Sequence, residues 1–244
     1  MKYFFTFFLL FNLVVHAQEK TTLYLIGDST MADKKDPDEN PEKGWGQMLP
    51  LVLNDQIVVA NRAMNGRSSK SFRTEGRWKE VIDSLQPNDF VFIQFGHNDQ
   101  KEKDSTRYTN PYTQYRHNLE RYVIETREKG ATPILFSSIT RRNFNEYGVL
   151  IDTHGAYPLV ARLVADDLKV PFIDLQLLTE QLEISYGVEG SKNLHLHFAP
   201  GENAYRPEGV EDNTHLSVTG ANLVVGLVVQ EIKKQKLELE KYIK

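Results

Sequence analysis

The amino-acid sequence predicts an α/β fold, a three-layer α/β/α sandwich around a five-stranded parallel sheet. Short runs rich in Val, Ile and Phe recur along the chain, and several are apolar without interruption, as strands covered on both faces are. Helical patterns lie between these runs, and such alternation produces parallel strands joined by right-handed crossovers. The expected strands are residues 22–27, 57–60, 89–95, 132–139 and 171–175.

Helix signals support the elements expected between and after these strands. Residues 77–85 carry apolar side chains at the spacing of one helix face. In the helix expected over 110–130, Asn110 is a suitable N-cap, Pro111 fits the first turn and Gly130 fits the end. The remaining helices are expected over 156–169, over 174–186 and from Ser217 to about residue 235.

Three polar segments directly follow expected strands, namely residues 27–29, 61–68 and 96–99. In open parallel sheets, ligands bind beyond the carboxyl ends of the strands. We therefore expect these segments to meet at one rim. Two other connections are expected to be irregular: the charged surface loop 33–43 and the long polar stretch 187–215.

Composition excludes several classes of protein. The 244 residues include no cysteine, which excludes a disulfide scaffold, thiol catalysis and cysteine metal sites. The formal net charge of −4 at pH 7 argues against broad nucleic-acid binding. The length suits one sizeable α/β domain, which we expect over residues 18–244.

The N-terminus has the pattern of a secretory signal peptide over residues 1–17. Lys2 precedes a short apolar run, and Val15, His16 and Ala17 fit a small-residue cleavage site. The run is short for a bilayer-spanning helix, although a retained anchor or a buried N-terminal segment are alternatives. We expect a secreted or periplasmic protein of bacterial origin, without membrane attachment after cleavage.

Ser29 is the first candidate catalytic residue, because Gly27-Asp28-Ser29 stands directly after a buried strand. The same three residues also form ordinary turns. If Ser29 is the nucleophile, Asp28 is expected to brace the turn that presents it, and is not the acid of a catalytic triad. A serine nucleophile needs a base within hydrogen-bond reach. The elbow motif G-x-S-x-G of the α/β-hydrolases occurs nowhere in the chain, so a serine hydrolase here must use another arrangement.

His215 is the candidate base, because Asp212 precedes it by three residues. If the segment forms one helical turn, the two side chains share a face and the carboxylate can orient the imidazole. Alternatively, Asp212 caps a helix and His215 lies on the surface. Ser217 is expected to cap the last helix.

Asn98 and Gly66 are candidate partners of a developing oxyanion. The amide of Asn98, in FGHND, can donate a hydrogen bond from the end of a strand. Gly66 suits a close approach of the backbone to a ligand. Each is also explained by a plain turn.

Taken together, these blocks resemble the SGNH (GDSL-type) hydrolases, whose motifs stand in the same order along the chain. A narrower resemblance to rhamnogalacturonan acetylesterases, within that group, rests on the segments GDSTMAD, GWGQMLP, NRAMNGRSSKSFRTEGRW, VFIQFGHNDQ and DNTHLSVTGA and on residues 141–144. The resemblance covers about residues 21–235. It implies the flavodoxin-like SGNH hydrolase fold and a carbohydrate esterase active in pectin degradation.

The resemblance also implies roles for single residues. Ser29 is the nucleophile, His215 the base and Asp212 the residue that orients it. The oxyanion hole is formed by the N–H groups of Ser29 and Gly66 and by the Asn98 side chain. No cofactor, metal ion or obligate protein partner is implied. The expected partner is an acetylated polysaccharide or oligosaccharide.

A galacturonate polymer is acidic, so its binding calls for local cations and sugar platforms. The candidates are Arg73, Arg77, Arg141 and Arg142, with His97 beside the site and Tyr205 in the late loop. Solvation or support of the fold explains the arginines equally well. Trp45 and Trp78 are further aromatic candidates, although Trp78 lies on an apolar helix stripe.

His195 and His197 are a candidate metal pair, because alternate residues of a strand face one side. No third ligand stands at a fixed spacing, so substrate-contacting or surface histidines are favoured. Two other functions remain open. One is an SGNH esterase acting on acetylated xylan or a lipid ester, and the other is a non-catalytic carbohydrate-binding protein on the same fold.

Overall fold

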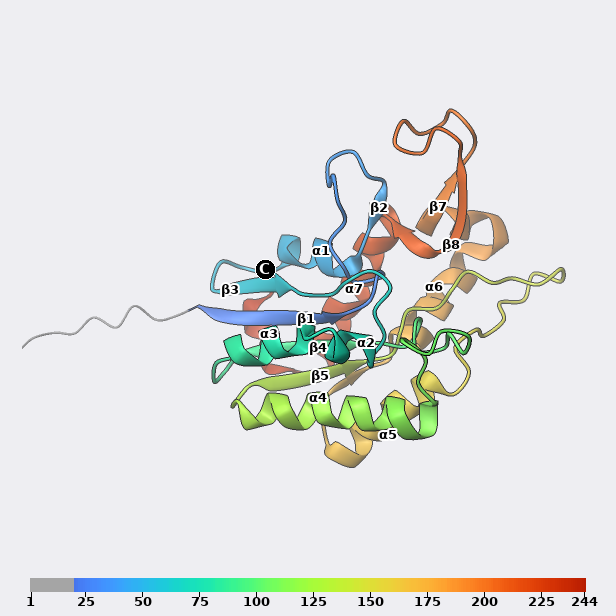
Figure 1. Cartoon of the computed structure of the whole chain (residues 1–244). Coiled ribbons are helices and arrows are strands. Elements are labelled where there is room, and N and C mark those ends of the chain that lie inside the picture. Colours follow the sequence, from blue (N-terminus) through green and yellow to red (C-terminus); the bar gives the residue numbers. More distant parts are fainter. Residues whose placement is uncertain (1–19) are drawn as a thin grey trace, which may run out of the picture.

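The computed structural model describes residues 20–244, so the expected signal peptide lies outside the described residues. Its centre is a five-stranded, all-parallel sheet in the order β3-β1-β4-β5-β6 (Figure 1). This confirms the predicted fold class. The strands are β1 (Thr21–Gly27), β3 (Ile57–Asn61), β4 (Phe90–Gln94), β5 (Thr132–Phe136) and β6 (Phe172–Ile173).

Alternate side chains of the sheet bury against two different helical layers. Leu23 and Leu25 of β1 belong to one cluster, which includes Trp45 and the apolar face of the helix Val218–Lys234. Tyr24 and Ile26 belong to the other, with Trp78 and the apolar faces of the helices Arg116–Glu128 and Tyr157–Leu168. The helices are α1 (Trp45–Met48), α2 (Ser71–Thr74), α3 (Arg77–Ser84), α4 (Arg116–Glu128), α5 (Tyr157–Leu168), α6 (Leu175–Gly190) and α7 (Val218–Lys234).

The predicted helix signals act as expected. The side chain of Asn110 accepts a hydrogen bond from the Tyr112 N–H at the start of a π-helical turn (Pro111–Tyr115) that leads into α4. Ser217 caps α7 by accepting from the Gly220 N–H. Gly130 ends its segment with a φ of +73°, a conformation that glycine adopts without strain. Among residues 20–244, no helix has the length and apolar character needed to cross a membrane.

A second, antiparallel sheet corrects two sequence expectations. It consists of β2 (Glu42–Lys43), β8 (Val210–Ser217) and β7 (His195–Phe198), in the order β2-β8-β7, and stands above the main sheet in Figure 1. The stretch 187–215 is therefore not simply irregular, since 3₁₀-helical residues Ser191–Leu194 and two strands occupy much of it. Loop 33–43 is likewise not wholly a surface loop, because it buries Lys34 and Lys43.

Candidate active site

Ser29 stands two residues beyond the end of β1, on a turn that Asp28 holds. The buried Asp28 carboxylate accepts hydrogen bonds from the N–H and the hydroxyl of Thr30, at 2.9 and 2.8 Å. The chain then folds back, with the Ala32 N–H donating to the Asp28 carbonyl at 3.0 Å. Gly27 packs so tightly that an added Cβ would lie 2.8 Å from the Gln94 carbonyl. This turn presents the Ser29 side chain at the rim of the sheet.

His215 links Ser29 to Asp212 through two hydrogen bonds. The ring Nε2 lies 2.9 Å from the Ser29 Oγ, and Nδ1 lies 2.7 Å from the Asp212 Oδ2. Ser29 and His215 are 186 positions apart in sequence. The three side chains thus form the arrangement in which a carboxylate orients an imidazole against a hydroxyl.

The segment that carries Asp212 and His215 is an irregular strand, and the helical turn considered from sequence is wrong. Along β7, His195 pairs with Leu216 but the next residue, Leu196, pairs with Asp212. Residues 213–215 therefore bulge out of the ladder. The Asp212 Oδ1 closes the bulge by accepting from the N–H groups of Thr214 (2.7 Å) and His215 (3.0 Å). This local turn puts both side chains on one side.

The electrostatics of the pair keep Asp212 ionised and favour the His215 tautomer that carries its proton on Nδ1. Partial burial alone would raise the pKa of Asp212, but hydrogen bonds from the ring and backbone of His215 hold that pKa well below its usual range. Burial likewise would lower the pKa of His215, yet the hydrogen bond and charge of Asp212 raise it. Asp212 therefore stays ionised, accepts the Nδ1–H, and leaves Nε2 free to take a proton from Ser29.

This raised pKa predicts the pH dependence of activity. The base must be neutral, and its folded pKa lies above the ordinary histidine value of about 6.5. We expect kcat/KM to fall as the pH drops through a midpoint above that value, because His215 then holds a proton. A pH–rate profile with a small acetyl ester measures the midpoint. A midpoint clearly below the ordinary value would contradict the assignment of His215 as the base.

A pocket of about 510 Å³ opens over Ser29. Asn98 lines it from the loop after β4, and Gly66 lines it from the loop after β3, with a φ of +78°. The Asn98 amide donates one hydrogen bond to the Arg67 carbonyl at 3.1 Å, which leaves its second N–H available. The lining residues are Ser29, Glu42, Asn65, Gly66, His97, Asn98, Lys101, Arg141, Thr214 and His215.

Asp99 joins the two loops that contribute Gly66 and Asn98. Its fully buried carboxylate accepts from the N–H of Ser69 and from the hydroxyls of Ser69 (2.6 Å) and Thr109 (2.7 Å). Burial raises the pKa of Asp99 to about 7, although these hydrogen bonds act to lower it. The carboxylate therefore connects the loop after β3 to the loop after β4.

The model of the GDSL-like lipase/acylhydrolase family matches residues 25–223 of the chain, which include every residue of this arrangement. The chain belongs to this family. It is 40% identical to the rhamnogalacturonan acetylesterase RhgT of Bacillus subtilis over 221 residues, which cover 91% of this chain and 93% of RhgT.

Solved structures agree with this family assignment. The YxiM protein of Bacillus subtilis superimposes with a TM-score of 0.77 at 26% identity, over 90% of this chain and 58% of YxiM. An acetylxylan esterase of Geobacillus stearothermophilus shares the fold, with a TM-score of 0.61 at 21% identity over 87% of this chain and 94% of that one. The rhamnogalacturonan acetylesterase relatives support a carbohydrate esterase, and the solved structures agree with its fold.

Lys34 is a site residue of this acylhydrolase that the sequence patterns did not indicate. Its ammonium group is buried and lies 2.7 Å from the Glu42 carboxylate. It also donates to the Ser29 carbonyl at 2.6 Å and to the Asn65 side chain at 3.1 Å. Lys34 thus joins the serine turn, the loop after β3 and the pocket wall. Its position in a charged loop gave no sign of burial.

His97, which the sequence analysis places beside the site, lines the pocket from a buried position. Its Nδ1 lies 3.3 Å from the Asp28 Oδ2, and its ring meets that of His154 edge-on at 4.7 Å. Burial lowers the pKa of His97, and the positive charge of Arg141 adds to this effect, although Asp28 opposes it. A neutral His97 that donates its Nδ1–H to Asp28 keeps Nε2 as a hydrogen-bond acceptor.

The predicted substrate arginines have different surroundings, and only Arg141 lines the pocket. Arg73 pairs with Glu125 at 2.7 Å and lies over the Tyr122 ring, while Arg77 pairs with Glu75 at 2.8 Å. Arg142 is buried and contacts the carbonyl of Val188 and the side chains of Ser191 and Asn213. The structure does not bring these three side chains to the pocket.

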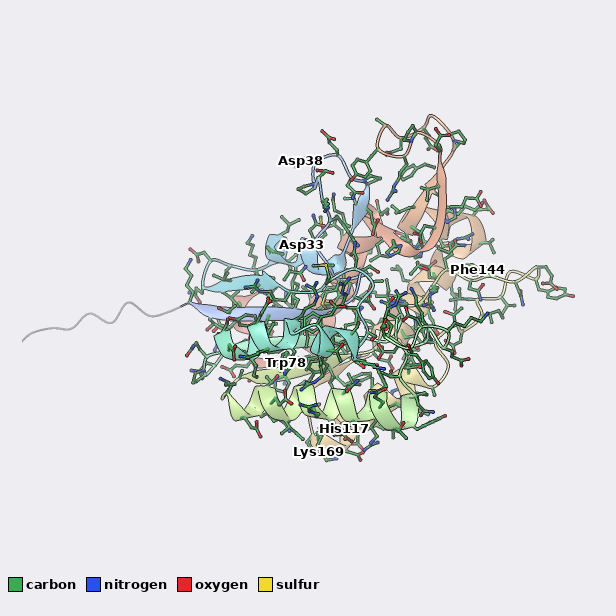
Figure 2. All side chains as sticks on the ribbon, in the orientation of Figure 1. Asp33, Asp38, Trp78, His117, Phe144 and Lys169 are labelled. Carbon is green, nitrogen blue, oxygen red and sulfur yellow. The ribbon has the colours of Figure 1, made fainter. Side chains whose placement is uncertain are left out.

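The predicted aromatic platforms also lie outside the pocket lining. The Tyr205 hydroxyl contacts Asp36 at 3.1 Å, between the β7–β8 connection and the loop before β2. Trp78 of α3 is labelled in Figure 2. Its ring meets that of Tyr122 on α4 edge-on, with the ring centroids 4.9 Å apart. Trp45 is fully buried and donates to the Gln94 side chain at 2.7 Å. Both tryptophans are core residues.

His195 and His197 lie on β7, and their ring nitrogens have different partners. The Nε2 of His195 meets Glu183 at 2.6 Å, whereas that of His197 meets the Asn213 side chain at 2.9 Å. His195 is buried, and it is therefore not the surface or substrate-contacting residue that the sequence favoured. Within residues 20–244, no three His, Asp or Glu side chains gather in a way that suits a metal ion.

Proposed function

We propose that this protein is a secreted or periplasmic acetylesterase that removes O-acetyl groups from pectic rhamnogalacturonan. The observation that carries the proposal is the hydrogen-bonded chain from Asp212 through His215 to Ser29, at the floor of an open pocket. The identity to a rhamnogalacturonan acetylesterase over nearly the whole length supports the substrate. The signal-peptide pattern of residues 1–17 supports the location.

The reaction proceeds by acyl transfer through Ser29. Its Oγ attacks the acetyl carbonyl carbon while His215 Nε2 takes the hydroxyl proton, and Asp212 stabilises the imidazolium that forms. The N–H groups of Ser29 and Gly66 and the free amide N–H of Asn98 receive the oxyanion. Removal of one such donor typically costs about 3–4 kcal/mol of transition-state stabilisation.

Collapse of the tetrahedral intermediate breaks the bond to the sugar oxygen. His215 gives its proton to this leaving oxygen, and the acetyl group stays on Ser29 as an ester. A water molecule then enters, gives its proton to His215 and attacks the acetyl carbon. Release of Ser29 with that proton yields acetate.

Two cations on one wall of the pocket fit an acidic polysaccharide. Lys101 and Arg141 both line the pocket, and within residues 20–244 neither side chain forms an ion pair with an acidic group. Arg141 is held instead by Gln100 (3.0 Å) and by the carbonyl and hydroxyl of Thr153. Galacturonate carboxylates supply the missing negative charge. Neutral xylan chains do not.

The proposed function is tested by acetate release from acetylated rhamnogalacturonan and from acetylated xylan. We expect a higher kcat/KM on the pectic substrate, and activity that declines from acetyl to longer acyl esters. An equal or higher kcat/KM on acetylated xylan would contradict rhamnogalacturonan as the preferred substrate. Glycan binding without any turnover would instead indicate a carbohydrate-binding protein.

Replacing Lys101 by methionine tests the cationic wall. We expect the ratio of kcat/KM on acetylated rhamnogalacturonan to kcat/KM on 4-nitrophenyl acetate to fall about fivefold to tenfold, since one charge contact near a surface is worth about 1 kcal/mol or more. The difference should shrink as salt is added. Lys233→Met on the exposed end of α7 is the matched control. An unchanged ratio would remove Lys101 from substrate recognition.

A further inference from the structure

The bulge that carries His215 depends on a second, buried histidine. The ring Nδ1 of His195 lies 3.1 Å from the backbone carbonyl oxygen of His215. The ring Nε2 of the same residue lies 2.6 Å from the Glu183 carboxylate of α6. His195 is 2% exposed and Glu183 is 3% exposed. A chain of contacts therefore runs from α6 through β7 to the backbone of the proposed catalytic base.

The geometry fixes which ring nitrogen of His195 carries a proton. A carbonyl oxygen only accepts hydrogen bonds, so Nδ1 must be the donor to His215. One further proton lies between Nε2 and Glu183. If this proton is on Nε2, His195 is an imidazolium beside the Glu183 carboxylate. If the proton is on Glu183, a neutral His195 ring lies beside a carboxylic acid. In both forms the pair is neutral overall, and in both the Nδ1–H faces the His215 carbonyl.

The backbone of His215 needs such a donor because the bulge interrupts the ladder. Residues 213–215 lie opposite no residue of β7, so side chains and other segments supply part of their hydrogen bonding. The Asn213 carbonyl accepts from the Arg142 N–H at 2.9 Å, and the His215 carbonyl accepts from the His195 ring. The imidazole of His195 thus takes a place that a ladder N–H fills in a regular strand.

We propose that His195, oriented by Glu183, is a positioning residue that holds the backbone of His215 so that its ring stays in line between Asp212 and Ser29. This inference rests on the proposed role of His215 as the base. His195 touches no substrate, and its effect is confined to the placement of Nε2 relative to the Ser29 hydroxyl. A shift of about 1 Å in such a contact costs up to about a hundredfold in rate.

Two replacements of His195, by asparagine and by glutamine, separate the positioning of His215 from general support of the fold. Asparagine places an amide nitrogen at the δ position and so keeps a donor for the His215 carbonyl. Glutamine places its nitrogen at the ε position, and so keeps a contact to residue 183 but loses that donor. Both are made together with Glu183→Gln, so that no carboxylate is left unpaired.

We expect E183Q/H195Q to lose about tenfold to a hundredfold in kcat on 4-nitrophenyl acetate, with little change in KM. E183Q/H195N should keep kcat within about threefold of the wild type. E183Q alone should also keep kcat, because the introduced side-chain amide donates to Nε2 of His195 and leaves the Nδ1–H in place. Equal losses in the two double variants, or no loss in either, would overturn the inference.

Thermal unfolding of each variant measures the effect of the substitution on the stability of the fold. Val164→Ala is the second control: it removes buried methyl groups on the distant α5, and so shows how a loss of core packing far from His215 affects kcat. If the double variants do not fold, ¹⁵N spectra of histidine-labelled wild-type protein give a second readout. The Nδ1 of His195 must carry a proton, and an unprotonated Nδ1 would refute the inference. Turnover that survives Ser29→Ala would instead refute the proposed mechanism.

Discussion

Replacing Ser29 by alanine is expected to lower kcat for acetate release by about 10⁵-fold or more, which is the scale seen when a serine nucleophile is removed. KM should change little, because the pocket walls stay in place. Within residues 20–244, the Ser29 side chain makes one hydrogen bond, to His215 Nε2, so the free energy of unfolding should also stay nearly constant. Coupled acetate detection on acetylated rhamnogalacturonan measures the loss.

The control for this variant is Ser105→Ala, a hydroxyl deletion in an exposed loop where only the backbone carbonyl is engaged. The double variant Ser29→Ala/His215→Ala adds a sharper test. The two residues act as a unit, so it should be about as slow as either single variant. Losses that multiply, or turnover close to that of the wild type in Ser29→Ala, would rule out the acyl-enzyme route.

Replacing Asp212 by asparagine is expected to lower kcat by about 10⁴-fold without disturbing the fold. The Asn Oδ1 can still accept from the N–H groups of Thr214 and His215, as the carboxylate does now. The atom facing the ring becomes an N–H donor, however, so Nδ1 must accept. The proton then sits on Nε2, which can no longer receive one from Ser29.

Steady-state kinetics and thermal unfolding of the Asp212 variant separate these two effects. Asp38→Asn is the matched control, because Asp38 lies on the outer loop before β2 (Figure 2) and is exposed. We expect the control to keep full activity. If Asp212→Asn also kept most of its activity, orientation of His215 by a carboxylate would not be part of the mechanism.

The main sheet was predictable because a strand that is buried on both faces has a continuous run of apolar residues in the sequence. The runs around Leu25, Phe92 and Leu135 are apolar whichever face each side chain meets. The ends of the strands were less well predicted. A strand was expected over residues 132–139, but β5 ends at Phe136. Residues 137–140 are buried too, and continuous burial does not indicate where pairing stops.

The second sheet was not predictable by the same reasoning. β2 has two residues, and β8 is polar from Glu211 to His215, so neither has an apolar run. Their pairing joins Glu42 to Ser217 and Lys43 to Leu216, positions that no local pattern connects. The turn expected at Asp212 became a strand bulge for the same reason, because its conformation is set by pairing with β7.

The catalytic candidates were predictable from their residue types and order, and their close approach was not. Spacing suggested that Asp212 serves His215, but the 2.9 Å contact between His215 and Ser29 depends on the tertiary fold. Charged residues were the least predictable. Lys34 and Arg142 are buried and hold backbone groups in place. The sequence suggested solvent for Lys34, and for Arg142 it left substrate binding, solvation and support of the fold open.

The pairing of β2 with β8 has a consequence for the order in which the molecule forms. Contacts between distant parts of a chain close late and slow folding. Ser29 follows β1, near the start of the described residues, whereas its proposed base His215 stands on the last strand, β8. Thr214 and His215 of β8 line the pocket, and the apolar face of α7 covers β1. The pocket and its proposed base are therefore completed together, when the C-terminal segment docks against β1 and β2.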